Sequence, residues 1–446
     1  MPARDDRQRK RFAVVGTGGR CRMFLDAAAG RFADHAELVG LCDPSATRMA
    51  HWNRHLADTF GHPPLPAYPP GRFDAMVAET RPDVVVVTSV DATHHTYIVR
   101  ALELGCEAVT EKPMATDAEK VAAVFEAVER TGGEVRVAFN YRWMPVFSAL
   151  KGVVASGAVG RPTLVDFQWR LDTSHGADYF RRWHREKKHS GGLLVHKATH
   201  HFDLVNWILD DRPERVFALG GLAFYGGANA AARGLPPAPE RFTGEPDAAD
   251  DPFALDLAAD PGLRGLYLDA EADSGYVRDR HVFGGESKWP ITSEDTMAVT
   301  ARMAGGALLN YSLVAYCPWE GERLSVVGTE GHVEYFGRGP GHIIAGQGDD
   351  DLAAAQRPVE QTLRLQRHFE PSRDLPIPEA EGGHGGGDAR LLERLFLPDL
   401  PPDPLGRDAS HHDGAWSVLA GVAANRSIET GRPVGIGELA PPSLCR

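Results

Sequence analysis

Short apolar runs alternate with amphipathic segments over the first 142 residues. Apolar runs stand at Phe12–Val15, in "AELVGLCDPS", at Pro82–Val90, in "CEAVTEKPMA" and in "EVRVAFNYRWMP". Continuous apolar strands separated by helices are typical of a parallel sheet that is covered on both faces. The pattern therefore predicts a doubly wound α/β domain over residues 10–142.

The pattern of residues 143–446 predicts a second α/β domain with two insertions. Alternating positions in "EDTMAVTARMAGGALLNYSLVAY" and "RLSVVGTEGHVEYF" predict strands, with a hairpin turn at the glycine pair of the first stretch. Trp416–Ile428 is expected to form a helix that packs the two domains together. Insertions are expected near residues 226–290 and 337–378, where Ala, Pro, Gly and Asp are frequent and periodicity is weak. The first insertion is expected to be a surface loop or an arm for a partner.

Composition narrows the classes of partner. The chain has 446 residues and a formal net charge of −13, so clustered cations for nucleic acid or an anionic membrane are not expected. No apolar run is long enough to predict a membrane span. The five cysteines are scattered and form no CxxC pair, which favours a reducing, cytoplasmic location.

A glycine turn follows the first predicted strand. Gly16, Thr17, Gly18, Gly19 and Arg20 stand between that strand and a predicted helix, as in a dinucleotide-binding turn. Gly16 allows a tight turn, and Gly18 lets the backbone approach a pyrophosphate at the helix N-terminus. The third glycine of the GxGxxG pattern is Cys21, so the match is partial.

The second predicted strand ends at Asp43. A carboxylate there can accept hydrogen bonds from both adenosine ribose hydroxyls and would repel a 2′-phosphate, so NAD is favoured over NADP. The alternative interpretation is that Asp43 caps the next helix, with Pro44 at the first helical position.

Polar residues also follow the later strands. Carboxyl ends of parallel strands meet at one edge of a sheet, where ligands bind. We therefore expect a cofactor site that includes the following residues: Ser89, His94, Glu111, Lys112 and Asn140.

The chain resembles the Gfo/Idh/MocA family of NAD(P)-dependent oxidoreductases. The resemblance rests on "VVGTGG", "EKPMATDAEKV", "FNYRWMPVFSALKGVVASGAVGRP", the block "GGLLVHKATHHFDLVNWIL" and "GVAANRSIETGRPVGIGEL". It implies a Rossmann domain followed by an α/β domain with a large, mostly antiparallel sheet that often joins subunits, here into a dimer or tetramer. It also implies that Lys112 reaches the substrate carbinol. His200 and Asp203 match the family's final histidine and aspartate, whereas His196 and Ala198 replace its first aspartate and its glycine.

The histidine block admits three interpretations. If residues 194–209 form a helix, His196 and His200 share one face. In the first interpretation they are ordinary core histidines. In the second they form an HxxxH metal pair, with Asp203, His201 or His281 as a third ligand. In the third they transfer protons. We favour proton transfer without a metal. His200 is then the general base, His196 a second catalytic candidate, and Lys112 a hydrogen-bond donor to the reacting oxygen.

Polar and aromatic residues suggest a sugar or glycoside as substrate. The expected substrate-binding residues are Lys112, Arg142, His175, Tyr179, Trp183, Lys197, His201, Tyr276 and His281. The leading hypothesis is an NAD-dependent oxidoreductase acting on a secondary hydroxyl, with ring carbon 3 as one position. An NAD-dependent glycosidase that uses transient oxidation and elimination is the close alternative. A non-catalytic NAD or sugar sensor is the third.

Overall fold

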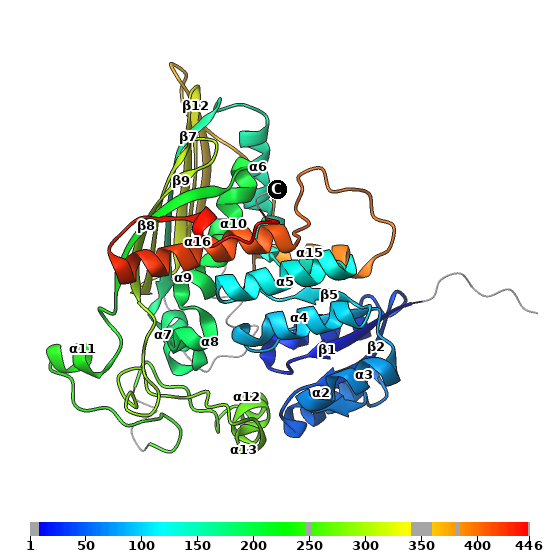
Figure 1. Ribbon diagram of the computed structural model, residues 1–446. Coiled ribbons are helices and arrows are strands. Elements are labelled where there is room, and N and C mark those ends of the chain that lie inside the picture. The colour runs from blue at the N-terminus through cyan, green and yellow to red at the C-terminus, as the bar shows by residue number, and fades with distance from the viewer. Residues whose placement is uncertain (1–8, 246–250, 340–358, 380–383, 445–446) are drawn as a thin grey trace, which may run out of the picture.

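The computed structural model describes residues 9–245, 251–339, 359–379 and 384–444. A parallel sheet with helices on both faces lies beside a larger, mostly antiparallel sheet (Figure 1). The fold class predicted from the sequence is therefore confirmed. Part of the second predicted insertion, 337–378, lies outside the described residues.

The first sheet has six strands in the order β3-β2-β1-β4-β5-β6, and every neighbouring pair is parallel. This order is typical of dinucleotide-binding sheets, in which it reverses between β1 and β4. The buried Val84–Val87 run of β4 illustrates why the strands form, since β-branched side chains pack well on both faces. The strands are β1 (Lys10–Val15), β2 (Ala36–Cys42), β3 (Ala67–Tyr68), β4 (Val84–Val87), β5 (Glu107–Thr110) and β6 (Val135–Val137).

The first five helices of the described chain pack on this sheet, and α15 (Gly387–Phe396) adds Phe396 against Phe12 of β1. The N-cap of the second helix is Ser45, whose side chain accepts a hydrogen bond from the backbone of Arg48. The interpretation of Asp43 as that cap is therefore wrong. The helices are α1 (Arg22–Ala29), α2 (Ala46–Phe60), α3 (Phe73–Thr80), α4 (His94–Glu103) and α5 (Ala118–Thr131).

The second sheet has nine strands in the order β14-β13-β12-β11-β7-β10-β9-β8-β15. Only the β7–β10 pair is parallel. Burial alternates along β9 and β10, so one face of the sheet packs on the core and the other is exposed. The predicted glycine hairpin joins these two strands. The strands are β7 (Pro162–Asp172), β8 (Pro213–Gly221), β9 (Thr296–Met303), β10 (Leu308–Cys317), β11 (Gly321–Gly328), β12 (Gly331–Arg338), β13 (Glu360–Arg367), β14 (Arg373–Asp374) and β15 (Val434–Gly435).

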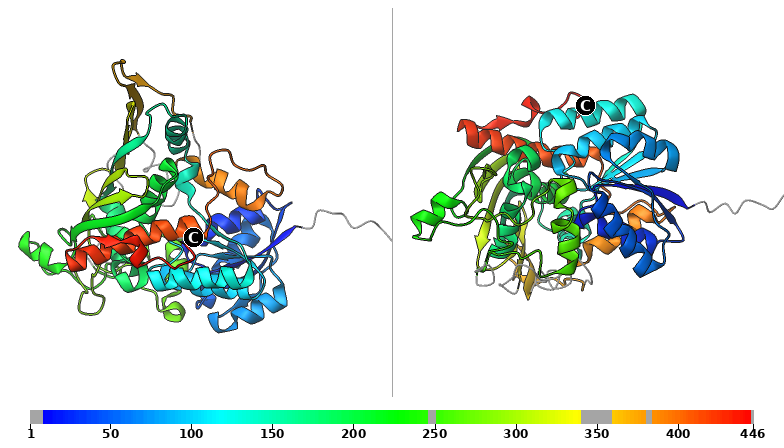
Figure 2. Two further views of the ribbon diagram at one scale, coloured as in Figure 1. Left: turned by 45° about the horizontal axis from the view of Figure 1, so that its top comes forward. Right: turned by 90° about the horizontal axis from the view of Figure 1, so that it is seen from below.

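The long helix α16 (His411–Thr430) contacts elements of both sheets. It contains the predicted helix Trp416–Ile428, and it packs on β8 and on α5 (Figures 1 and 2). A Cβ at Gly421 would lie 2.2 Å from the carbonyl oxygen of Leu194, so a glycine is needed where α16 crosses the histidine block. The helices of this half are α6 (Pro145–Ala155), α7 (Thr173–Arg181), α8 (Lys187–Ser190), α9 (Leu193–His196), α10 (Ala198–Leu209), α11 (Gly227–Ala232), α12 (Pro261–Leu263), α13 (Glu271–Ser274) and α15 (Gly387–Phe396). None of the helices in the described part of the chain combines the length and apolar character needed to cross a bilayer.

The first insertion folds back onto the parallel sheet's own helices. Its segment from α12 through the π-helix η7 (Arg264–Leu268) to α13 lies beside α2 (Figure 1). Leu266 is 7% exposed and belongs to the apolar cluster on that side of the parallel sheet. Asp273 accepts hydrogen bonds from Ser45 Oγ (2.5 Å) and from the backbone of Thr47 (2.9 Å). This segment of the predicted insertion 226–290 therefore packs on the parallel-sheet domain.

A buried ion pair fixes the junction between the two halves. Arg142 Nε and Nη2 donate to the Asp203 carboxylate at 2.8 and 2.5 Å. Arg142 Nη2 also donates to Asp413 at 2.8 Å. The side chains of Arg142 and Asp203 are 2% and 1% exposed. Arg142 was expected to bind substrate, but these contacts hold it in the protein interior.

Removing one partner of this pair is expected to destabilise the fold. Asp203→Asn leaves a buried guanidinium without its full counter-charge, which costs about 3 kcal/mol in free energy of unfolding. Urea unfolding followed by circular dichroism measures the change. Asp374→Asn, in an exposed pair with Arg364, is the matched control and should leave the urea midpoint unchanged. Equal midpoints for Asp203→Asn and wild type would contradict the structural role.

Candidate active site

A cavity of about 730 Å³ opens at the carboxyl edge of the parallel sheet. Its walls come from the strand ends, from the histidine block, from α7 and from the first insertion. The predicted residues that line it are Gly16, Gly18, Gly19, Arg20, Asp43, Ser89, His94, Glu111, Lys112, Asn140, His175, Tyr179, Trp183, His196, Lys197, His200 and Tyr276. Sequence reasoning therefore placed most of these side chains at one site.

Four predicted residues do not line the cavity. Thr17 is fully buried and Arg142 is held in the ion pair described above. His201 Nδ1 lies 2.6 Å from the hydroxyl of Tyr311, inside the core. His281 accepts a hydrogen bond from the backbone of Phe283, away from the cavity. The expectations that His201, His281 and Arg142 contact substrate are therefore not supported by their positions.

The glycine turn has the geometry that a dinucleotide requires. Gly16 has a φ of +86°, and a Cβ there would lie 2.4 Å from the backbone of Ser89, so no other residue fits. A Cβ on Gly18 would meet no atom within 4 Å, which leaves open space for a pyrophosphate. Cys21, in place of the third glycine, is fully buried in the apolar cluster behind the turn. The turn thus fits a nicotinamide dinucleotide despite the partial motif.

Asp43 and Arg48 stand at the end of the cavity that would hold adenosine. Asp43 accepts hydrogen bonds from the backbone of Thr17 (2.6 Å) and Ser45 (2.8 Å) and still faces the cavity. Arg48 also lines this end of the cavity, where its Nε donates to the carbonyl of Leu266 and its guanidinium lies over the ring of Tyr276. The carboxylate of Asp43 is the group that can accept from two ribose hydroxyls.

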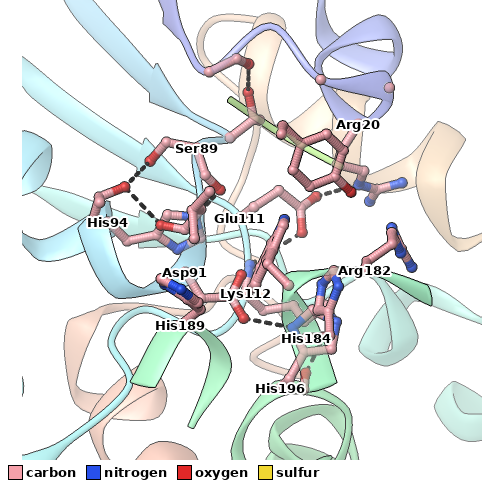
Figure 3. Close-up of a pocket in the computed structure, with 18 of the residues that line it drawn as sticks. Arg20, Ser89, Asp91, His94, Glu111, Lys112, Arg182, His184, His189 and His196 are labelled. Atoms are coloured by element: carbon pink, nitrogen blue, oxygen red, sulfur yellow. Dashed lines mark hydrogen bonds and ion pairs between the residues drawn. The ribbon is translucent and has the colours of Figure 1, made fainter. Parts of the chain in front are cut away.

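Lys112 lies at the centre of the cavity (Figure 3). Its amine donates to the carbonyl oxygen of His196 at 3.1 Å. Burial lowers the Lys112 pKa to about 8, although the carboxylates of Asp91 and Glu111 oppose the shift. Arg20 donates to Glu111 at 2.6 Å and so shares that carboxylate. An amine with this pKa can exchange a proton near neutral pH.

The carboxyl partner of His196 comes from the parallel sheet. Asp91, just after β4, lies 2.5 Å from His196 Nδ1. Burial raises the pKa of Asp91 and lowers the pKa of His196, because both charged forms lose solvation. His196 therefore does not stand alone in the position where relatives are expected to carry an aspartate. It holds a carboxyl partner from another segment.

His200 lies on the next turn. The structure divides the predicted helix 194–209 into α9 and α10 at Lys197, yet both His196 and His200 still face the cavity. The His200 ring stacks on Tyr141 at 4.1 Å, and Lys197 donates to the Tyr141 hydroxyl at 3.0 Å. In the described part of the chain, no three His, Cys, Asp or Glu side chains gather as metal ligands would.

Several lining residues were given no role from the sequence. They are Asp91, Tyr141, Arg182, His184, Tyr267, Arg280 and Glu320. The position of Asp91 just past a buried strand does place it at the ligand edge of the sheet, and Arg182 and His184 belong to a polar and aromatic stretch that suggests a sugar substrate. The others come from loops or from the insertion, where no spacing rule indicates which side chain turns inward. His184 illustrates this, since its ring lies 4.1 Å from the His196 ring and 3.6 Å from Trp183.

The fold and the site define the class of protein. A glycine turn on a parallel sheet, facing a lysine and histidines at the strand ends, belongs to an NAD(P)-dependent oxidoreductase that acts on CH–OH groups. Residues 10–139 match the oxidoreductase family's NAD-binding Rossmann fold, and residues 151–436 match its C-terminal alpha/beta domain. The chain belongs to the Gfo/Idh/MocA oxidoreductase family.

Known proteins agree with this assignment. YteT of Bacillus subtilis (strain 168), named as an oxidoreductase, is 36% identical over 428 residues, 94% of this chain and 95% of YteT. Inositol 2-dehydrogenase of Rhizobium meliloti (strain 1021) is 29% identical over 210 residues, 47% of this chain and 57% of that enzyme. The structure of the WlbA dehydrogenase from Bordetella pertussis with NADH and UDP-GlcNAcA has a TM-score of 0.62 at 18% identity, covering 96% of this chain and 99% of that one.

The position of Lys112 predicts an unusual titration. We expect its amine to be charged below pH 8 and neutral above it, because burial outweighs the two carboxylates. NMR of protein labelled with ¹³C at the lysine ε-carbon should show one resonance with a midpoint near pH 8. That resonance should be absent from Lys112→Arg and present in Lys288→Arg, which changes a lysine side chain that is 61% exposed. Titration of every lysine above pH 10 would contradict the prediction.

Proposed function

We propose that this enzyme oxidises a secondary hydroxyl of a sugar or glycoside, or forms it in reverse, with NAD as the hydride acceptor. The observation that carries the proposal is Lys112 beside the Asp91–His196 pair, at the strand ends and within a polar, aromatic cavity. The similarity to an inositol 2-dehydrogenase supports a polyhydroxylated ring as substrate. Ring carbon 3 is one candidate position.

The choice of NAD over NADP rests on Asp43. A 2′-phosphate next to this buried carboxylate would be repelled, whereas two ribose hydroxyls can donate to it. Arg48 lines the same part of the cavity, with its Nε bonded to the carbonyl of Leu266 and its guanidinium over the ring of Tyr276.

Each residue has a role in this proposal. Bound NAD supplies hydride acceptance at its nicotinamide ring. The Gly16–Arg20 turn holds the pyrophosphate, with Ser89, His94, Glu111 and Asn140 around the rest of the dinucleotide. Lys112 donates a hydrogen bond to the reacting oxygen and stabilises its developing negative charge.

The histidines complete the proton path. His200 takes the hydroxyl proton as general base. His196, fixed by Asp91, binds a neighbouring hydroxyl. The rings of Tyr179 and Trp183 offer apolar faces to the sugar, while His175, Lys197 and Tyr276 offer directed polar groups.

We also propose a homodimer or tetramer in a cytoplasmic setting. The exposed face of the nine-stranded sheet carries a shallow groove over β7 to β10, with Leu219 63% exposed and Leu308 47% exposed at the surface. The family that the chain resembles often joins subunits through this sheet. Size-exclusion chromatography with light scattering tests the assembly.

The proposed reaction predicts NADH formation with one or more members of a panel of sugars and glycosides. Lys112→Met should lower kcat by about 10²- to 10⁴-fold, because a positioned proton-transfer or oxyanion group is lost. Lys288→Met is the matched control and should retain wild-type rates. Absorbance at the nicotinamide band, read beside aglycone release, measures both products. Aglycone without NADH would favour the redox-neutral glycosidase, and NAD binding without turnover would favour the sensor.

Cofactor preference gives a second prediction. Asp43→Ser should raise the KM for NAD about 10- to 100-fold and lower the KM for NADP, because the repulsive carboxylate is gone. Steady-state kinetics with both cofactors measure the ratio of kcat/KM. Asp34→Asn, at an exposed position of the same domain, is the control. A wild-type preference for NADP would overturn the assignment.

A further inference from the structure

We infer that Tyr179, His175 and Glu320 form a second proton-transfer centre, which removes and returns the proton on the carbon next to the newly formed carbonyl. Tyr179 is the group that contacts substrate. His175 positions the Tyr179 hydroxyl and accepts its proton, and Glu320 orients His175. The inference rests on the proposed oxidation, because a carbonyl is what makes the neighbouring C–H acidic.

The three side chains form a continuous hydrogen-bonded chain. His175 Nδ1 lies 2.8 and 3.0 Å from the two carboxylate oxygens of Glu320, and His175 Nε2 lies 3.2 Å from the Tyr179 hydroxyl. His175 and Tyr179 are four residues apart on α7, so they share one face of that helix. Glu320 comes from the loop between β10 and β11. All three residues line the cavity.

The carboxylate decides which way each hydrogen points. Glu320 can only accept when ionised, so His175 carries its proton on Nδ1 and offers the lone pair of Nε2 to Tyr179. The Tyr179 hydroxyl is therefore the donor, and its proton has a path to the imidazole. This is the arrangement of carboxylate, imidazole and hydroxyl that activates nucleophiles and bases in other enzymes.

The surroundings of Tyr179 keep its hydroxyl protonated at rest. Burial raises its pKa to about 12, whereas Lys197 and Arg182 lower it. The Arg182 guanidinium lies 5.8 Å from the centre of the Tyr179 ring. A neutral phenol at rest, with two cations and an imidazole beside it, can become a base only when His175 accepts its proton. His175 and Glu320 thus supply the proton acceptor that the Tyr179 phenol needs before it can act as a base.

This centre is separate from the Lys112 group but reaches the same substrate. The Tyr179 ring lies 5.4 Å from the His196 ring, and His196 is the residue whose carbonyl holds Lys112. Oxidation of one hydroxyl requires one proton acceptor, and the lysine and the histidine block already provide it. A second relay, with the side chain of Glu320 only 12% exposed and that of His175 20% exposed, is more than a single oxidation needs.

The proposed step transfers two protons and shifts one electron pair. The substrate C–H proton moves to the Tyr179 oxygen while the Tyr179 proton moves to His175 Nε2, and the imidazolium is paired with Glu320. The C–H electron pair forms the carbon–carbon double bond of an enolate, whose oxygen is held by Lys112. Reversal returns a proton to the same carbon. Partial exposure of His175 lets that proton exchange with solvent.

Solvent exchange tests this step without requiring net oxidation. The NAD-loaded enzyme is incubated in D₂O with a panel of cyclic keto sugars, and ¹H NMR follows loss of the signal next to the carbonyl. Reduction of the same keto sugars is measured separately with NADH. The quantity compared among variants is the exchange rate divided by the reduction rate.

We expect Tyr179→Phe to lower this ratio at least about 100-fold, because a proton-transfer group is lost while substrate binding affects both rates alike. His175→Gln and Glu320→Gln should lower it in the same direction. Tyr68→Phe removes a hydroxyl bonded to Glu79, and neither of these residues lines the cavity, so this matched control should leave the ratio unchanged. Circular dichroism and NAD binding verify that each variant is folded.

Each outcome has a distinct meaning. Wild-type exchange that falls selectively in Tyr179→Phe supports the relay. Reduction without exchange in the wild type, or equal ratios in wild type and Tyr179→Phe, overturns the relay and leaves the proposed oxidoreductase intact. Neither reduction nor exchange with any keto sugar overturns the proposed substrate class and the relay together.

Discussion

The contact between Asp91 and His196 joins the two halves of the molecule at the site itself. One partner stands at the end of a parallel strand, and the other stands on a short helix of the second domain. The pair therefore exists only while both halves keep their relative positions. The buried Arg142–Asp203–Asp413 cluster and the crossing of α16 over the histidine block maintain those positions. Local chemistry at the cavity thus depends on packing that lies well outside it.

The local parts of this architecture follow from sequence patterns. Apolar strands with intervening amphipathic helices specify the parallel sheet, and polar residues at the strand ends specify where ligands lie. Gly16, Asp43 and Lys112, which these rules put at the ligand edge of the sheet, line the cavity. The short edge strand β3 was not predicted, because two residues give no periodicity.

The distant parts do not follow from such patterns. Nothing in the spacing of Glu320 or Tyr267 shows that they turn toward the glycine turn or α7, since their neighbours in space are far away in sequence. Arg142 was expected in the cavity because a buried arginine and an exposed ligand-binding arginine look alike in a sequence. Burial with two carboxylates distinguishes them, and burial is a property of the whole fold.

The insertion that covers α2 has a consequence for altering cofactor use. The Tyr267 hydroxyl accepts a hydrogen bond from the backbone of Gly19, and the ring of Tyr276 lies against Arg48. Residues some 250 positions downstream of the glycine turn thus complete the walls around it. Engineering that exchanges residues of the Rossmann domain alone would leave the walls that the insertion supplies unchanged. To change which nicotinamide dinucleotide this enzyme uses, residues of the insertion and of the parallel sheet have to be varied together.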